Sequence, residues 1–206
     1  MEKVHIVVFD VETRKLSQNL GCPEKPCVHE RNSCGWDALK RGEGGLSVIA
    51  LWDSYDNRMY LYDMHTMEGL AHHLESADVV VGFNSQEFDV KPIEGILNRK
   101  LRLKNHVDIL QLIWTALRSR GVRLKGNTLD EVAKRTIGRG KSGDGMHAPQ
   151  LADEGRWAEL FQYCMDDVDL TRELIFYIIN NGGVIGPDGK FLPLDLPSIL
   201  KAKTKE

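Results

Sequence analysis

Two runs of aliphatic and β-branched residues do most to constrain the fold of this 206-residue chain. "VHIVVFD" lies near the N-terminus, and "DVVVGFN" covers residues 78–84. Runs without polar alternation are typical of strands buried on both faces, which predicts a sheet between layers of helices. The first run leads into "FDVET", where Asp10 and Glu12 are separated by a single residue.

The rest of the sequence contains both strand-like and helix-like segments. Strands are predicted at about 3–10, 46–53 and 58–64, and helices at about 66–77, 87–100, 127–137 and 153–180. "HVDIL" leads into a further amphipathic stretch that runs up to Leu117. We therefore expect an α/β fold with a mixed central sheet flanked by helices. Residues 1–206 are expected to form a single domain, with a Cys- and Gly-containing insertion at about 14–45 and a C-terminal hairpin and tail at about 183–206.

The composition is that of an ordinary soluble protein, with 42% hydrophobic and 28% charged residues. No apolar run approaches the ~18 residues that span a membrane, and Asp10 interrupts any signal-peptide pattern. Four cysteines are too few for a secreted disulfide scaffold. We expect a cytoplasmic protein with no membrane partner.

Positive charge is concentrated in the middle of the chain. Residues 99–141 hold twelve Lys and Arg against three Asp and Glu, whereas the whole chain has a net charge of −3. A basic segment in an otherwise acidic chain suits a nucleic-acid backbone, although solvated helix faces would give the same count.

Carboxylates recur at three places that a fold could bring together. Alternation along a strand puts Asp10 and Glu12 on one face about 7 Å apart, where they repel unless a cation lies between them. Asp89 follows the second buried run, and Tyr163 and Asp167 share a helix face at i, i+4. Taken singly, these acids could equally be a solvated strand end, a helix N-terminal acid and a surface pair.

Taken in order, the motifs "FDVET", "GFNSQEFD" and "YCMDD" form one pattern. It resembles the DEDD superfamily of 3′–5′ exonucleases in its tyrosine-bearing branch (DEDDy), most closely the proofreading exonuclease domain of family B DNA polymerases. The likeness spans about 3–180. The histidine-bearing branch would need His at a position occupied by Gln162. The insertion at 14–45 is not part of the pattern.

The resemblance implies an RNase H-like (DnaQ-like exonuclease) fold and a metal-dependent hydrolase. It implies cleavage at 3′ ends of single-stranded nucleic acid, with DNA favoured over RNA, releasing nucleoside 5′-monophosphates. Two divalent cations, Mg²⁺ or Mn²⁺, would supply the chemistry, and such hard ions prefer oxygen ligands. The metal-binding catalytic residues would be Asp10, Glu12, Asp89 and Asp167, with Tyr163 orienting the attacking water.

Because this chain has no room for a polymerase, the same resemblance implies either a stand-alone nuclease or one that works with a replication or repair protein as partner. Two alternatives stay open at this point. One is an RNA-directed or structure-selective nuclease on the same fold, and the other is a non-catalytic nucleic-acid-binding domain.

Other residues are candidates of lower specificity. Four residues are expected to contact substrate: Thr13, Asn84, Phe88 and Lys141, of which Phe88 is equally suited to the core. The backbone of the bound strand is expected to be held by Arg118–Lys125 and Arg139–Lys141. His72 and His73 are expected to be solvated, and Cys164 to be buried. Four possible zinc ligands, Cys22, Cys27, His29 and Cys34, follow one another at a spacing that is cramped for a structural zinc site. The alternative is a flexible loop with free thiols.

Overall fold

The computed structural model describes residues 3–15, 20, 33–121, 125–141 and 148–201. Its centre is a five-stranded sheet of order β3-β2-β1-β4-β5. The strands are β1 (Ile6–Thr13), β2 (Leu46–Asp53), β3 (Arg58–Tyr62), β4 (Val79–Gly82) and β5 (His106–Asp108). β2 is antiparallel to β1 and β3, whereas β1, β4 and β5 run parallel, so the predicted mixed sheet is confirmed.

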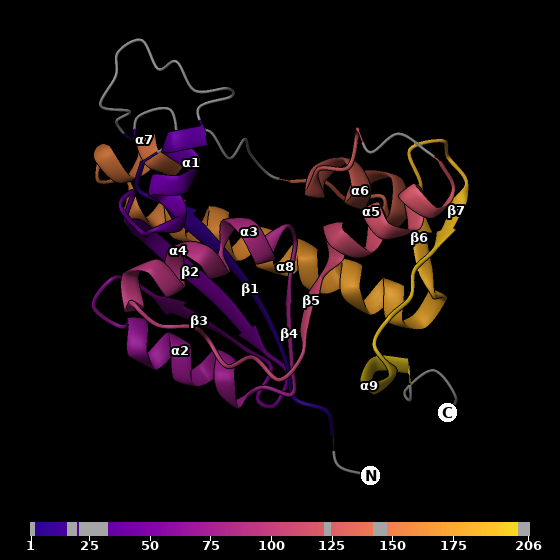
Figure 1. Ribbon diagram of the computed structural model, residues 1–206, viewed down its shortest axis with the longest axis horizontal. Helices are drawn as coiled ribbons and strands as arrows, with labels where there is room; N and C mark the ends of the chain where they lie inside the picture. Colours follow the sequence, from indigo (N-terminus) through magenta and orange to yellow (C-terminus); the bar gives the residue numbers. More distant parts are fainter. Residues whose placement is uncertain (1–2, 16–19, 21–32, 122–124, 142–147, 202–206) are drawn as a thin grey trace.

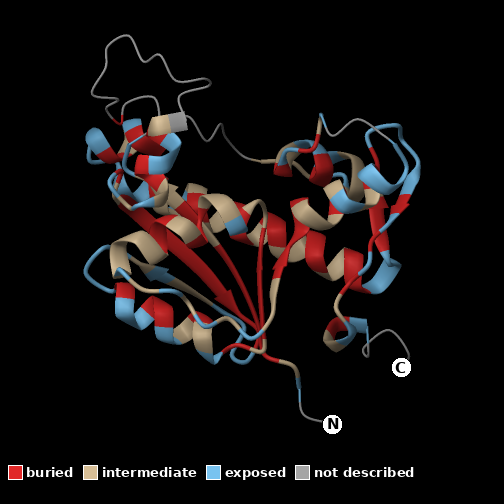
Figure 2. Cartoon of the chain, viewed as in Figure 1, coloured by how far each residue is buried: buried red, intermediate tan, exposed pale blue. Residues whose placement is uncertain are grey.

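Alternate residues of the central strands enter two different cores. Val8 of β1 and Ala50 of β2 belong to the core beneath α8 (Trp157–Asn181), whereas Val7, Phe9 and Leu51 belong to the core beneath α2 (Met67–Ser76) and α4 (Val90–Leu97). Figures 1 and 2 show the buried strands between these helices. The unbroken apolar runs in the sequence reflect this burial on both sides.

The remaining elements surround the sheet and extend beyond β5. A two-stranded antiparallel sheet of β6 (Gly183–Ile185) and β7 (Phe191–Pro193) lies beside α5 and α6, on the right in Figure 1. The other helices are α1 (Ser33–Lys40), α3 (Ser85–Phe88), α5 (Ile109–Ser119), α6 (Leu129–Ile137), α7 (Ala148–Asp153) and α9 (Ser198–Lys201). Among the described residues, no helix is long and apolar enough to cross a membrane.

Three local expectations differ from the structure. β1 continues to Thr13 instead of ending near Asp10, because Glu12 still pairs with Val48 of β2. The helical region expected at about 153–180 begins earlier and is divided, with Gly155 at φ 69° between α7 and α8. Within the expected insertion, residues 33–40 form a helix, α1.

Helix α1 is fixed to the rest of the domain by a close approach to α4. A Cβ atom added at Gly95 of α4 would lie 2.4 Å from the carbonyl carbon of Arg41 and 2.7 Å from the oxygen of Lys40. Only glycine allows the chain leaving α1 to come so near. On the other side, Lys40 forms an ion pair with Glu87 of α3 at 2.6 Å.

This approach predicts opposite effects for two helical glycines. Gly95→Ala should lower stability by about 2 kcal/mol, or roughly 4–8 °C in Tm, because backbone atoms of Arg41 must move. Gly69→Ala on α2 is the control, since its added Cβ would meet Tyr62 Cε1 at an ordinary 3.7 Å and alanine favours a helix. Thermal unfolding followed by circular dichroism measures both, and equal Tm values would contradict the account.

Candidate active site

The carboxyl ends of the parallel strands meet at one edge of the sheet. Val8 of β1 is level with Val81 of β4, and Gly82 of β4 is level with Asp108 of β5. The residues that follow these positions are therefore brought together, and they include Asp10 and Glu12. This is the edge where open α/β sheets bind their ligands.

Helix α8 brings the last motif to the same edge. Asp10 pairs with Ala50, so its side chain is on the face that α8 covers, and the Cys164 thiol lies 3.6 Å from the Asp10 carbonyl oxygen. Carboxylate oxygens of Asp10, Glu12 and Asp167 all lie within 4.8 Å of one another. Cys164 is fully buried, as expected from the sequence.

Tyr163 and Asp167 lie on one face of α8, as their i, i+4 spacing predicts. Lys141 Nζ lies 3.3 Å from the Tyr163 hydroxyl and 2.5 Å from Asp167 Oδ2, so both side chains reach one point. Asp166 instead accepts a hydrogen bond from Gln162 one turn earlier, at 2.7 Å. The neighbouring acids of "MDD" thus have different surroundings.

Asp89 comes to the cluster from another part of the chain, close enough for the charges of Asp10 and Asp167 to add to the effect of burial and raise the pKa of its carboxyl. It lies between α3 and α4, seven residues beyond the end of β4, and is 6% exposed. Its Oδ2 atom is buried without a hydrogen-bond partner among the described residues. A buried carboxylate oxygen of this kind has a place for a cation, because leaving it unpaired is costly.

Asp108 shapes this side of the site without joining the cluster, and sequence reasoning did not single it out. It caps α5 by accepting from the backbone N–H groups of Leu110 and Gln111, and it also accepts from those of Asn84 and Gln86. Asn84 is held at φ 64° in the left-handed region. The available signal was an Asp placed between a short apolar strand and a helix, the usual position of a helix cap.

Burial and mutual repulsion disfavour the ionised acids. Burial, followed by the charge of Asp167, raises the pKa of Asp10 to about 7. Burial is also the main cause that raises the pKa values of Glu12, Asp89 and Asp167, and Asp10 adds to the first two. A cluster with these properties is typical of functional sites.

Lys141 supplies the positive charge that the cluster needs. Its burial opposes the charged form, but the carboxylates of Asp167 and Asp10 outweigh burial and raise the pKa of the ammonium group. The ammonium also lies 5.5 Å from the centre of the Tyr163 ring. Lys141 was predicted to contact substrate, and the structure places it among the acids as well as at the cleft beside them.

A cleft of about 400 Å³ opens from this cluster. Asp10, Lys141, Asn84 and Trp114 are among the residues that line it. The indole Nε1 of Trp114 is buried with no hydrogen-bond partner among the described residues. The other lining residues are Phe83, Leu110, Asn127, Thr128 and Leu129.

Of the four residues predicted to contact substrate, Asn84 and Lys141 line this cleft, and Thr13 and Phe88 do not. Thr13 follows a register shift at the end of β1 and pairs with Leu46. Phe88 meets Trp36 of α1 edge to face, with 4.9 Å between ring centroids. The segment expected as an insertion therefore contributes an aromatic side chain next to Asp89.

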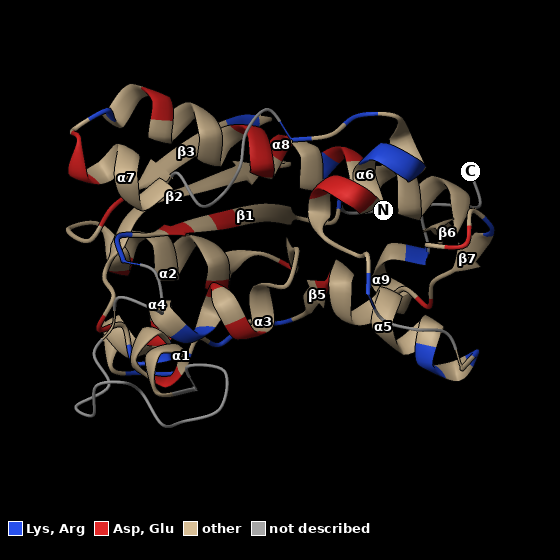
Figure 3. Ribbon diagram, turned by 90° about the horizontal axis from the view of Figure 1, so that it is seen from above, with Lys and Arg blue, Asp and Glu red and all other residues tan. Residues whose placement is uncertain are grey.

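The basic segment is divided among several surfaces. Arg139 is paired with Asp169 and Glu173 of α8, and Lys134 with Asp130 of its own helix. Figure 3 shows Lys and Arg interspersed with Asp and Glu. Arg118 is exposed and lies over the Trp114 ring at 5.9 Å, which leaves a cation next to the cleft.

The possible zinc site predicted at Cys22, Cys27, His29 and Cys34 lies mostly outside the described residues. Cys22, Cys27 and His29 lie outside the described residues, and Cys34 is in α1. His73 differs from expectation, because it is hydrogen-bonded to Asp53 at 2.7 Å, whereas His72 is exposed as predicted.

Comparison with known proteins identifies the family. A family model of the RNase H superfamily matches residues 36–179, more than two thirds of the chain. The chain belongs to the RNase H superfamily. The matched segment contains Asp89, Tyr163 and Asp167, and the strand with Asp10 and Glu12 precedes it. A search of curated proteins gave no match.

A solved structure supports the same fold. The chain is similar to the family B DNA polymerase from the hyperthermophilic archaeon Pyrobaculum calidifontis, with a TM-score of 0.60 and 19% sequence identity. The similarity covers 87% of this chain and 25% of the polymerase chain. At this identity the likeness shows the fold alone, and the RNase H-like fold predicted from the motifs is confirmed.

The residues of this superfamily member fit a divalent metal. The donor set consists of carboxylate oxygens, which hard cations prefer over nitrogen and sulfur. Asp10, Glu12 and Asp167 are close enough to share an ion, and Asp89 presents a buried oxygen without a partner among the described residues. The repulsion recorded in the raised pKa values is what a bound cation would remove.

These pKa shifts predict an unusual pH dependence of the stability of the metal-free protein, measured in EDTA. Because the pKa of Asp10 rises from 3.8 to about 7 on folding, the native state binds the extra proton between about pH 4 and 7. Stability from this group therefore falls as pH rises through that window. Asp10→Asn should remove this loss and be more stable than wild type at pH 7.5, with a Tm higher by roughly 4 °C or more.

Tm measured against pH in EDTA tests this expectation, with Asp166→Asn as the neighbouring control that follows wild type. Added Mg²⁺ or Mn²⁺ should raise the wild-type Tm at pH 7.5 and leave that of Asp10→Asn nearly unchanged. If the curves of Tm against pH were parallel for wild type and Asp10→Asn, with or without metal, the pKa of Asp10 would not be raised in the folded protein.

Proposed function

We propose that this chain is a metal-dependent 3′–5′ exonuclease of the tyrosine-bearing DEDD branch. Its substrate is single-stranded nucleic acid, with DNA favoured, and its products are nucleoside 5′-monophosphates. The observation that carries the proposal is the convergence of Asp10, Glu12, Tyr163 and Asp167, with Asp89 near enough to feel their charges, beside a cleft that Asp10 and Lys141 line. DNA is favoured over RNA because the three motifs resemble those of the proofreading exonuclease domain of family B DNA polymerases.

The acids are proposed to hold two divalent cations, Mg²⁺ or Mn²⁺, with Asp10, Glu12 and Asp167 on one side and Asp89 on the other. When bound, such ions activate a water molecule and stabilise the attacking and leaving oxygens of a phosphodiester. The chain's own contribution is to fix the oxygens of Asp10, Glu12 and Asp167 on a strand and a long helix, which position side chains more precisely than loops do.

Tyr163 acts as a hydrogen-bonding group rather than as a base. Burial raises the pKa of its hydroxyl, so the group remains protonated at neutral pH. It can therefore orient the attacking water but cannot take its proton. Lys141, at 3.3 Å from this hydroxyl, is placed to bind a phosphate oxygen at the mouth of the acid cluster.

The cleft is proposed to hold the last nucleotides of the strand. Its aromatic and amide side chains, such as Trp114 and Asn84, can stack on bases and hydrogen-bond to them with little sequence preference. Arg118 lies over Trp114 and is suited to the next phosphate. On the other side of the site, Trp36 and Phe88 offer a second aromatic surface. A replication or repair protein remains the proposed partner.

A single assay tests the activity. The chain is incubated with 5′-labelled single-stranded DNA, duplex DNA and single-stranded RNA, in Mg²⁺, in Mn²⁺ and in EDTA. We expect a ladder that shortens from the 3′ end of single-stranded DNA with either metal and no cleavage in EDTA. Asp10→Asn should reduce cleavage to background, and Tyr163→Phe should slow it on the order of 10²-fold.

Asp166→Asn is the matched control, because Asp166 adjoins Asp167 in the chain and bonds to Gln162 instead of the cluster. It should cleave as wild type does. Faster cleavage of RNA or of duplex junctions would favour the RNA-directed or structure-selective nuclease. Binding without cleavage in either metal would leave the non-catalytic domain as the correct reading.

A further inference from the structure

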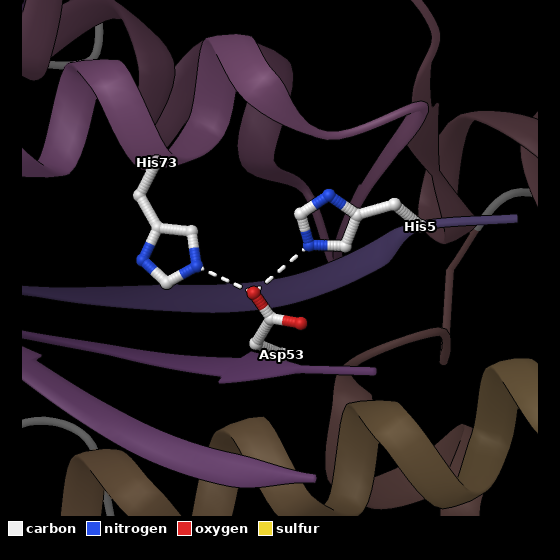
Figure 4. Close-up of side chains that lie close together, drawn as sticks. All are labelled: His5, Asp53 and His73. Carbon is white, nitrogen blue, oxygen red and sulfur yellow. Dashed lines mark hydrogen bonds and ion pairs between the residues drawn. The ribbon is translucent and has the colours of Figure 1, made fainter. Parts of the chain in front are cut away.

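A second group of metal-ligating side chains lies away from the carboxylate cluster. His5 Nε2 lies 2.9 Å from Asp53 Oδ2, and His73 Nε2 lies 2.7 Å from the same oxygen. Figure 4 shows the two imidazole rings converging on this carboxylate. The side chains of His5 and Asp53 are each 8% exposed, and that of His73 is 15% exposed.

The group is separated from the candidate active site by the sheet itself. His5 precedes β1 and Asp53 ends β2, where it pairs with Val7. Asp10 pairs with Ala50, three residues or about 10 Å further along β2 and on the other face. His5 and Asp53 instead share the face covered by α2, which carries His73.

We propose that His5, Asp53 and His73 bind a transition-metal ion of the Zn²⁺ class. Two imidazole nitrogens and one carboxylate oxygen suit zinc, whereas Mg²⁺ prefers oxygen alone. The three ligand atoms lie within 4.8 Å of one another. Zinc bonds of 2.0–2.2 Å place tetrahedral ligands about 3.3 Å apart, so the histidines need to withdraw from Asp53 by roughly 0.5 Å.

In the metal-free structure each Nε2–H donates to Asp53 Oδ2, so metal binding requires each Nε2 to lose its proton, and the surroundings support that change. His73 Nδ1 lies 2.7 Å from the Tyr62 hydroxyl, so it can donate its proton there while Nε2 faces the ion. Asp53 Oδ1 accepts from the backbone N–H of Tyr55, which fixes the carboxylate, and the Tyr55 ring stacks on His5 at 3.9 Å. Such outer contacts orient ligands in metal sites.

The site joins three elements that are distant in the sequence. A bound ion would link the start of β1, the end of β2 and α2, and the partial exposure of His73 gives the ion a way in. Three protein ligands leave one position for solvent. Without metal, the same residues form a hydrogen-bonded network, and this is the alternative that the experiment distinguishes.

The test measures zinc binding and does not depend on nuclease activity. The whole chain is dialysed against Zn²⁺ with excess Mg²⁺, which occupies the all-oxygen cluster, and bound zinc is counted by mass spectrometry. His5→Gln and His73→Gln should each bind one equivalent less than wild type. His72→Gln, an exposed neighbour on α2, should bind as wild type does.

All these variants keep Cys22, Cys27, His29 and Cys34, so any zinc held there is the same in each. A wild-type crystal soaked in Zn²⁺ needs no variant and should show an anomalous peak between the two imidazole rings. No peak there, together with equal zinc content in folded variants, would overturn the proposal and assign the group to a hydrogen-bonded network.

Discussion

The partial burial and mutual repulsion of the carboxylates at the end of β1 are the constraint on which the rest of this site depends. Each pKa unit by which a folded protein disfavours an ionised acid is worth about 1.4 kcal/mol. The pKa of Asp10 is raised to about 7, and those of Glu12, Asp89 and Asp167 are raised with it. A chain keeps such a cluster only where a cation completes it, and Lys141 provides one here.

Several features that look unrelated keep this arrangement in place. Helix α8 packs directly on β1, with Cys164 against the backbone of Asp10. The carboxylate of Asp108 accepts hydrogen bonds from four backbone N–H groups and so fixes the turn that leads to Asp89. Gly95 lets α1 approach α4, and α1 in turn sets Trp36 against Phe88. The fold thus surrounds the acids with elements that cannot easily move apart.

Local periodicity was enough to predict part of this site. Alternation put Asp10 and Glu12 on one face, and the i, i+4 spacing did the same for Tyr163 and Asp167, because both rules act within one element. The buried runs predicted the mixed sheet. The strand that continues past Asp10 was missed, since only pairing with β2 extends it.

Contacts between distant segments were beyond the reach of those rules. Asp108 reads as an ordinary helix cap until β4 and β5 place the turn at Asn84 above it. His73 was expected in solvent, but Asp53, twenty residues earlier, lies against it. Lys141 was predicted only to contact substrate, and its ion pair with Asp167 depends on how α8 crosses the sheet.

The central claim is that these carboxylates form a cation site in which Lys141 balances the charge of the metal-free protein. A crystal structure of the chain in Mn²⁺, with data collected at the manganese edge, tests it most directly. We predict anomalous peaks among Asp10, Glu12, Asp89 and Asp167, with the Lys141 ammonium withdrawn from Asp167 Oδ2. Saturating Mn²⁺ that leaves the Lys141–Asp167 pair intact and gives no peak beside Asp10 would contradict the account.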